Sequence, residues 1–175
     1  MRSGLYLLGP LSDEDVEWIT GNGIKETVAP GKSVIVEGEP LDAIFIILDG
    51  SFDVHLRNDQ RSVADLHAGE FVGEISLLDS RPPSASVTAR EQSIVLRIPR
   101  SRLNTKFQTD TAFAARMFRA IGTLLAQRLR QANQKLMQGA ASEHDSADDI
   151  DPDVLEASAI AATRFQLILK KLSKS

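Results

Sequence analysis

Cysteine is absent from this 175-residue sequence, and so are long hydrophobic runs. Without cysteine the chain can form no disulfide framework, no thiolate metal site and no cysteine nucleophile. The longest wholly apolar stretch, Ala43 to Leu48, is far shorter than the about 20 residues that a bilayer-spanning helix needs. The apolar run from Leu5 to Leu8 is also too short for the core of a signal peptide. We therefore expect a cytoplasmic protein with no membrane partner.

Histidine and excess positive charge are also scarce. The formal net charge is −4, so the chain has no overall basic field with which to bind nucleic acid. The three histidines, His55, His67 and His144, contain no His-x-His pair, which argues against a three-histidine metal site. Neither a P-loop nor a nucleophile elbow is present. These absences predict a sensing or interaction module, not an enzyme, with no metal and no other cofactor.

Turn residues divide the first part of the sequence into short segments. Ser12 is a suitable cap for a short helix, which Gly21-Asn22-Gly23 then ends. From Ile24 to Ile98 the segments are β-prone and the turn signals recur regularly. These signals are Pro30-Gly31, Gly38-Glu39-Pro40, Asp49-Gly50, Asn58-Asp59 and Ala68-Gly69. Such punctuation is typical of an all-β sandwich or roll.

The dipeptide Asp49-Gly50 separates two segments of different character. Residues 43–48 are apolar on both faces, which predicts a central buried strand. From Ser51 onward apolar and polar residues alternate, which predicts a strand with one wet face. Because a type I′ turn needs positive φ at both central positions, Asp-Gly is a strong signal for it. We therefore expect the two segments to form a β-hairpin.

The hydrophobic period changes near Arg100, and residues 111–138 are predicted to form one long helix that Gly139 caps. One stripe of this helix has apolar residues at the spacing of a buried face. The stripe consists of Phe118, Ile121, Leu125, Leu129, Ala132 and Leu136. We expect it to pair with a second copy of the chain and to form a homodimer.

Three parts follow from these patterns. Residues 1–138 are expected to form one domain that includes the long helix. Residues 139–150 are small, polar and acidic, which predicts a flexible linker. Residues 151–175 are expected to form an amphipathic helix with Pro152 in its first turn. Because a soft linker precedes it, we expect this helix to dock on the dimer or on an effector protein and to stay outside the core.

Residues 69–87 contain the chemistry of a candidate anion site, with the sequence GEFVGEISLLDSRPPSASV. A helical turn after Gly73 would present backbone N–H groups at a positively polarised N-terminus. The carboxylate of Glu74 can accept a hydrogen bond from a sugar hydroxyl, and the hydroxyl of Ser84 can donate one to a phosphate oxygen. The Pro82-Pro83 pair predicts a bend that returns the chain to a strand.

This segment resembles the phosphate-binding cassette of the cyclic-nucleotide-binding domain family, which includes β-rolls of the catabolite activator protein and protein kinase A regulatory subunit types. The resemblance covers roughly residues 11–136. It implies an α+β, mainly β fold, namely a β-roll of the double-stranded β-helix (jelly-roll) type with a short N-terminal helix, a long C-terminal helix and an extra terminal helix. It also implies a ligand, cyclic AMP or cyclic GMP, at Gly73, Glu74, Ile75, Ser76, Ser84 and Ala85.

The resemblance assigns Glu74 to the ribose 2′-hydroxyl, and it assigns the backbone at Ile75 and Ser76 to the phosphate. One position departs from the family pattern, because Pro83 stands where the family has the arginine that pairs with the cyclic phosphate. Proline offers neither a charge nor an N–H donor. Arg81, two residues earlier, is the alternative phosphate contact. In the long helix the base-facing position falls near Ala132 and Asn133, and Asn133 either contacts a purine edge or faces solvent.

Two functions remain open. The first is a regulatory module that binds a cyclic nucleotide and transmits its ligand state through the C-terminal helices to an effector. The second is a degenerate β-roll that acts as a homodimeric scaffold; Pro83 favours this one, whereas Gly73, Glu74 and Ser84 favour the first. DNA binding is not expected, because the family's DNA-binding members add a helix-turn-helix domain where this sequence has a linker and one helix.

Overall fold

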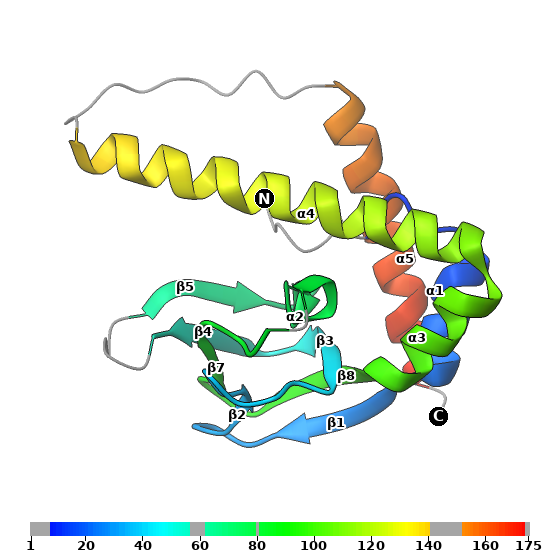
Figure 1. Ribbon diagram of the computed structural model, residues 1–175, viewed down its shortest axis with the longest axis horizontal. Coiled ribbons are helices and arrows are strands. Elements are labelled where there is room, and N and C mark those ends of the chain that lie inside the picture. Colours follow the sequence, from blue (N-terminus) through cyan, green and yellow to red (C-terminus); the bar gives the residue numbers. More distant parts are fainter. Residues whose placement is uncertain (1–7, 57–61, 80, 141–151, 174–175) are drawn as a thin grey trace.

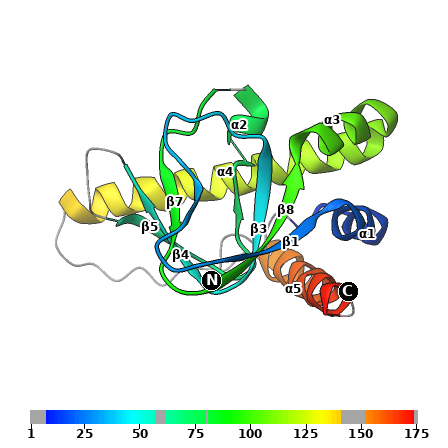
Figure 2. The same ribbon diagram turned by 90° about the horizontal axis from the view of Figure 1, so that it is seen from below.

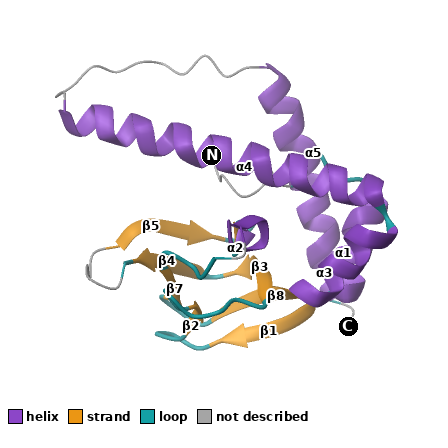
Figure 3. Ribbon diagram, viewed as in Figure 1, coloured by secondary structure: helices purple, strands orange, loops and turns teal. Residues whose placement is uncertain are grey.

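The computed structural model describes residues 8–56, 62–79, 81–140 and 152–173. In these ranges the strands are β1 (Ile24–Val28), β2 (Ser33–Ile35), β3 (Ala43–Asp49), β4 (Ser51–His55), β5 (Ser62–His67), β6 (Phe71–Val72), β7 (Ser86–Ala89) and β8 (Ser93–Pro99). The helices are α1 (Asp13–Asn22), α2 (Glu74–Asp79), α3 (Arg100–Thr109), α4 (Thr111–Ala140) and α5 (Pro152–Leu172). Helix α4 runs along one side of the strands, and α1, α3 and α5 gather at one end (Figures 1 and 3).

The strands form two antiparallel four-stranded sheets, with the orders β1-β8-β3-β6 and β2-β7-β4-β5. Phe45 and Ile47 on β3 belong to the core cluster that also contains Phe52 of β4. The alternate β3 residues Ile44 and Ile46 belong to the cluster that contains the helices. Because successive side chains of a strand point to opposite faces, β3 is buried on both sides, as its sequence predicts. The mainly β roll expected from the sequence is confirmed.

The predicted hairpin between β3 and β4 is wrong. Strand β3 pairs with β8 and β6, whereas β4 pairs with β5 and β7. The turn itself is present, because Gly50 has φ +88° and a Cβ there would overlap the side chain of Ser93. Both edges of β3 are already paired, so the Asp49-Gly50 turn carries the chain from one sheet to the other. A local turn signal does not specify the sheet that the next strand joins.

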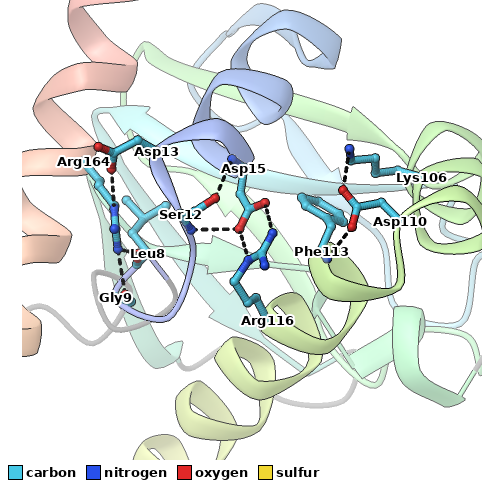
Figure 4. A network of polar contacts seen from close by, with 10 residues as sticks. All are labelled: Leu8, Gly9, Ser12, Asp13, Asp15, Lys106, Asp110, Phe113, Arg116 and Arg164. Carbon is cyan, nitrogen blue, oxygen red and sulfur yellow. Dashed lines mark hydrogen bonds and ion pairs between the residues drawn. The ribbon is translucent and has the colours of Figure 1, made fainter.

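Helix α1 begins as its sequence predicts, with a capping box between Ser12 and Asp15. Asp15 is only 3% exposed and accepts two hydrogen bonds from Arg116 of α4, at 2.6 and 2.8 Å (Figure 4). Burial by itself would raise the pKa of Asp15, but the hydrogen bonds from Arg116 and Ser12 lower that pKa below its usual value. Asp15 therefore remains charged and fixes α1 to α4.

Helix α5 is part of the core, so the expectation that it stays outside is wrong. Its buried side chains are spaced by four, three and four residues and join the same cluster as α1 and α4. They are Ala161, Phe165, Ile168 and Leu172. Figure 2 shows α5 beside α1 at the end of the roll. The sequence pattern identifies the apolar face of α5 but does not identify the surface, far away in the chain, that covers it.

Polar contacts reinforce this docking. Arg164 donates hydrogen bonds to the carbonyl oxygens of Leu8 (3.0 Å) and Gly9 (2.7 Å), and its Nε lies 3.0 Å from a carboxylate oxygen of Asp13 (Figure 4). At the other end of α5, Lys25 donates to the carbonyl oxygen of Leu172 at 3.1 Å. Helix α5 is therefore bound to the N-terminal segment and to β1.

Helix α4 differs between its two halves. The first half buries five side chains, Phe113, Met117, Ala120, Ile121 and Leu124. Ile121 therefore packs in its own core, which removes it from the stripe expected to face a second copy, whereas Phe118 and Leu129 are exposed. The helix continues to Ala140, so Gly139 lies inside its last turn and does not cap it. The side chain of Leu136 lies outside the described residues, as do residues 141–150 of the expected linker.

Across residues 8–56, 62–79, 81–140 and 152–173, no helix is both long enough and apolar enough to cross a membrane.

Because Ile168 is fully buried, Ile168→Ala is expected to lower the free energy of unfolding by about 2–5 kcal/mol. Gln166→Ala, on the exposed face of α5, is the matched control and should change it by less than about 0.5 kcal/mol. Urea denaturation followed by circular dichroism measures both values. Equal midpoints for the two variants would contradict the packing of α5 in the core.

Candidate functional site

A cavity of about 560 Å³ lies between the cassette segment, strand β5 and helix α4. Seven of the eight site residues expected from the sequence line it, namely Gly73, Glu74, Ile75, Ser76, Arg81, Ser84 and Ala85. Asn133 is exposed and is not among the lining residues, whereas its neighbours Gln131 and Ala132 are. The structure thus brings the cassette residues together, and of the two expected α4 positions Ala132 lines the cavity and Asn133 does not.

Gly73 joins β6 to α2 in a conformation that favours glycine. Its φ is +96°, and a Cβ there would lie 3.0 Å from the carbonyl oxygen of Ala43 and 3.0 Å from a methyl group of Leu41. The six-residue helix α2 begins immediately afterwards at Glu74. Gly73 therefore lets the chain turn tightly enough to place Glu74 in the cavity.

The Pro82-Pro83 bend is fixed to the turn that follows β2. The carbonyl oxygen of Pro83 accepts a hydrogen bond from the N–H of Gly38 at 2.9 Å. The side-chain hydroxyl of Ser86 accepts one from the N–H of Glu37 at 3.0 Å. The bend holds Ser84 and Ala85 against the cavity, as the sequence predicts.

Arg81 lies at the exposed rim of the cavity. Its side chain is 84% exposed, and its Nε lies 3.9 Å from a carboxylate oxygen of Asp79. The backbone N–H of Arg81 also donates to Asp79, at 3.0 Å. The guanidinium group is therefore largely in water, where an ion pair contributes little.

The strongest polar contact of the cavity joins Glu74 to Arg128 of α4. Glu74 is only 2% exposed, and Nη1 of Arg128 donates to both of its carboxylate oxygens, at 2.8 and 2.9 Å. Nη2 of Arg128 donates to the carbonyl oxygen of Phe71 at 2.6 Å. One side chain therefore connects the long helix to β6 and to α2.

Sequence reasoning missed Arg128, although a signal was present. Arg128 precedes Ala132 by four residues, so the two positions share one face of the helix. The base-facing position near Ala132 thus indicated the cavity side of α4, and the cation one turn earlier lies on that side. Both residues line the cavity.

Burial raises the pKa of Glu74, and the charge and hydrogen bonds of Arg128 oppose this rise. Among the described residues that line the cavity, the cations are Arg81 and Arg128, and the carboxylates are Asp65, Glu70, Glu74 and Asp79. Glu70 is occupied by the chain itself, because its carboxylate accepts a hydrogen bond from the N–H of His67 at 2.8 Å. The arrangement offers one buried carboxylate, one half-buried cation and a hydroxyl from Ser84.

The rest of the cavity wall is largely apolar. Val63 and Leu66 of β5 lie on one side, with Val54, Val87 and Ala132 from neighbouring elements. Such walls suit a flat, weakly polar ring. In the described part of the chain no cluster of histidine and carboxylate residues is arranged to hold a metal ion. His144 of the sequence lies outside that part.

Comparison with known proteins identifies relatives of this chain. Residues 25–110 match the family model described as cyclic nucleotide-binding domain. The cAMP-dependent protein kinase regulatory subunit of Yarrowia lipolytica is 38% identical over 65 residues, which is 37% of this chain and 17% of the relative. The cyclic AMP receptor protein of Thermus thermophilus is 29% identical over 140 residues, which is 76% of this chain and 61% of the relative. The chain thus spans less than two thirds of either relative.

Solved structures share the fold. A cyclic nucleotide-binding domain from Methylobacillus flagellatus superposes with a TM-score of 0.68 at 22% identity, over 77% of this chain and 78% of that one. At this level of identity the likeness concerns the β-roll and its helices.

Arg128→Gln is expected to lower the free energy of unfolding by about 1–3 kcal/mol, because it leaves the Glu74 carboxylate buried without its partner. The loss should grow as pH rises. Without Arg128 the pKa of Glu74 in the folded state rises further, so the folded state keeps a proton that the unfolded state releases above its own, lower pKa. Urea denaturation at pH 5 and pH 8 measures this dependence.

The double variant Glu74→Gln with Arg128→Gln is the control for that measurement. It has no carboxylate at this position, so its stability relative to the parent should vary much less between the two pH values. A stability loss in Arg128→Gln that is equal at pH 5 and pH 8 would contradict the buried charge pair.

Proposed function

Since residues 25–110 belong to the cyclic nucleotide-binding domain family, we propose that this chain is a regulatory module that binds cyclic AMP or cyclic GMP in the cavity between the cassette and α4. The observation that carries this proposal is the convergence of Gly73, Glu74 and Ser84 on one cavity. In the proposed complex Glu74 accepts a hydrogen bond from a ribose hydroxyl, and Ser84 donates one to the phosphate. The names of the relatives, a regulatory subunit and a receptor protein, support a binding role over an enzymatic one.

The dimensions of the cavity suit this ligand. Its volume of about 560 Å³ falls within the about 300–1,000 Å³ usual for small-molecule sites. The apolar residues of β5 provide a wall for the purine ring, and the cassette provides polar groups for the ribose and the phosphate. The cavity therefore offers the apolar and the polar contacts that this ligand needs.

The output of the module is proposed to be a shift of α4. This helix forms part of the cavity wall through Arg128, so a ligand that binds Glu74 acts on a group that α4 already holds. A ligand changes an arrangement only through different affinities for its two states, and the Glu74–Arg128 contact provides such a difference. Arg116 of α4 binds Asp15 of α1, and α1 packs on α5. A shift of α4 would therefore also move α1 and α5. An effector protein would recognise that change.

A second function is favoured by Pro83, which contributes no cation to the cavity. In this alternative the β-roll no longer binds nucleotides and serves as a homodimeric interaction scaffold. Both functions include a dimer that forms through α4.

Titration calorimetry with cyclic AMP and cyclic GMP tests the proposal. Pro83→Arg is expected to tighten binding by about 10-fold to 150-fold, because a charge-assisted hydrogen bond to phosphate contributes about 1.5–3 kcal/mol. The substitution keeps the carbonyl that Gly38 binds. Glu74→Ala should weaken binding because it removes the proposed ribose acceptor. If neither the parent nor Pro83→Arg binds either nucleotide at millimolar concentration while both remain folded, the scaffold function replaces the sensor function.

Leu129→Glu tests the dimer. Leu129 is 63% exposed on α4, on the same stripe as Phe118, so a charge there should break a helix-to-helix interface without disturbing the core. Light scattering should give the mass of a dimer for the parent and of a monomer for the variant. Thr123→Glu places the same charge on another exposed face of α4 and should leave the dimer intact. An unchanged mass for Leu129→Glu would exclude this stripe as the interface.

A further inference from the structure

An anionic ligand needs a cation in the cavity, and position 83 supplies none. Of the two arginines among the described lining residues, Arg81 is 84% exposed and lies beside the carboxylate of Asp79. The side chain of Arg128 is 28% exposed and enters the cavity wall from α4. Electrostatic attraction is stronger where less water surrounds the charge. Arg128 is therefore the better placed of the two cations.

Arg128 also has N–H donors beyond those that bind Glu74 and Phe71. A guanidinium group carries five N–H donors. The Nη1 donors bind the two carboxylate oxygens of Glu74, and one Nη2 donor binds the carbonyl of Phe71. These contacts do not use the Nε–H or the second Nη2 donor of Arg128. The side chain can thus hold Glu74 and still donate to a second anion.

The chemistry of the ligand brings such an anion close. In a 3′,5′-cyclic nucleotide the 2′-hydroxyl and the phosphate-bearing 3′-oxygen are on adjacent ribose carbons. A ligand whose 2′-hydroxyl binds Glu74 therefore places its phosphate near the group that Glu74 binds, which is the guanidinium of Arg128. Arginine suits this role because its planar donors can bind two anions at once.

We propose that Arg128 is the phosphate-binding cation of this site and that it binds Glu74 and the ligand phosphate together. This inference rests on the proposed function. It extends that function by assigning phosphate recognition to α4 and not to the cassette. The ligand would then be an anionic ribonucleotide with an unmodified 2′-hydroxyl. Phosphate binding would restrain α4 directly, without an intermediate movement of the cassette.

The test compares each cyclic nucleotide with its uncharged nucleoside. The ratio of the Kd of adenosine to the Kd of cyclic AMP reports the contribution of the phosphate, and guanosine with cyclic GMP gives the same ratio for the other base. Arg128→Gln should lower this ratio by about 10-fold to 150-fold while adenosine binding changes much less. Arg128→Lys keeps the charge and should retain part of the ratio. Arg130→Gln removes the same charge from an exposed position of α4 outside the cavity lining, so it is the matched control and should leave the ratio unchanged. Arg81→Gln tests the competing cation at the rim and should lower the ratio far less than Arg128→Gln does.

Rescue provides an independent readout. Adding Pro83→Arg to Arg128→Gln supplies a cassette cation and should raise the ratio by a larger factor than Pro83→Arg does in the parent, where Arg128 already binds the phosphate; equal factors in the two backgrounds would contradict a shared phosphate contact. Circular dichroism establishes that each variant is folded. If Arg128→Gln and Arg128→Lys weaken adenosine and cyclic AMP by the same factor, Arg128 serves only to hold Glu74 and the inference is overturned. A ratio that falls in Arg81→Gln instead also overturns it. Absence of nucleotide binding by the parent and by Pro83→Arg would instead refute the proposed function, and this inference with it.

Discussion

The contact between Glu74 and Arg128 is the interaction on which the cavity depends. A carboxylate that is almost wholly buried is costly unless a cation and hydrogen bonds compensate it. That cation belongs to α4, whereas the carboxylate belongs to α2, so neither element can take its position independently of the other. One ion pair therefore holds α2 and the α4 wall of the cavity together. A ligand that contacts Glu74 also acts on the packing of the long helix.

Local turn signals predicted an all-β sandwich or roll, and the resemblance to a known family narrowed this to a β-roll with a phosphate-binding cassette. The two-faced apolar segment at β3, the glycine at position 73 and the Pro-Pro bend each depend on neighbours close in the chain, and the structure places all three as expected. The short helix after Ser12 belongs to the same group, because its capping box lies within four residues.

The features that the sequence did not predict depend on contacts between residues far apart in the chain. Asp49-Gly50 makes a turn whatever strand follows, and the strand partners of β3 come from β6 and β8, later in the chain. The apolar face of α5 is visible in the sequence, but the surface that covers it comes largely from α1, near the other end of the chain. The pairing of Arg128 with Glu74 spans 54 residues. Periodicity gives the face of a helix on which a residue lies, but it does not give the element that this face meets.

The two halves of α4 make it a lever. With 30 residues at about 1.5 Å each the helix is roughly 45 Å long. Among its described side chains Leu124 is the last buried one, and farther along Leu129 and Met137 are exposed. A tilt of about 5° around Ala120 would displace the far end by roughly 2–3 Å, since about 20 residues extend beyond that pivot. An adjustment of about 1 Å at Arg128, roughly 12 Å from this pivot, would thus be magnified about 2.5-fold at the far end of the helix.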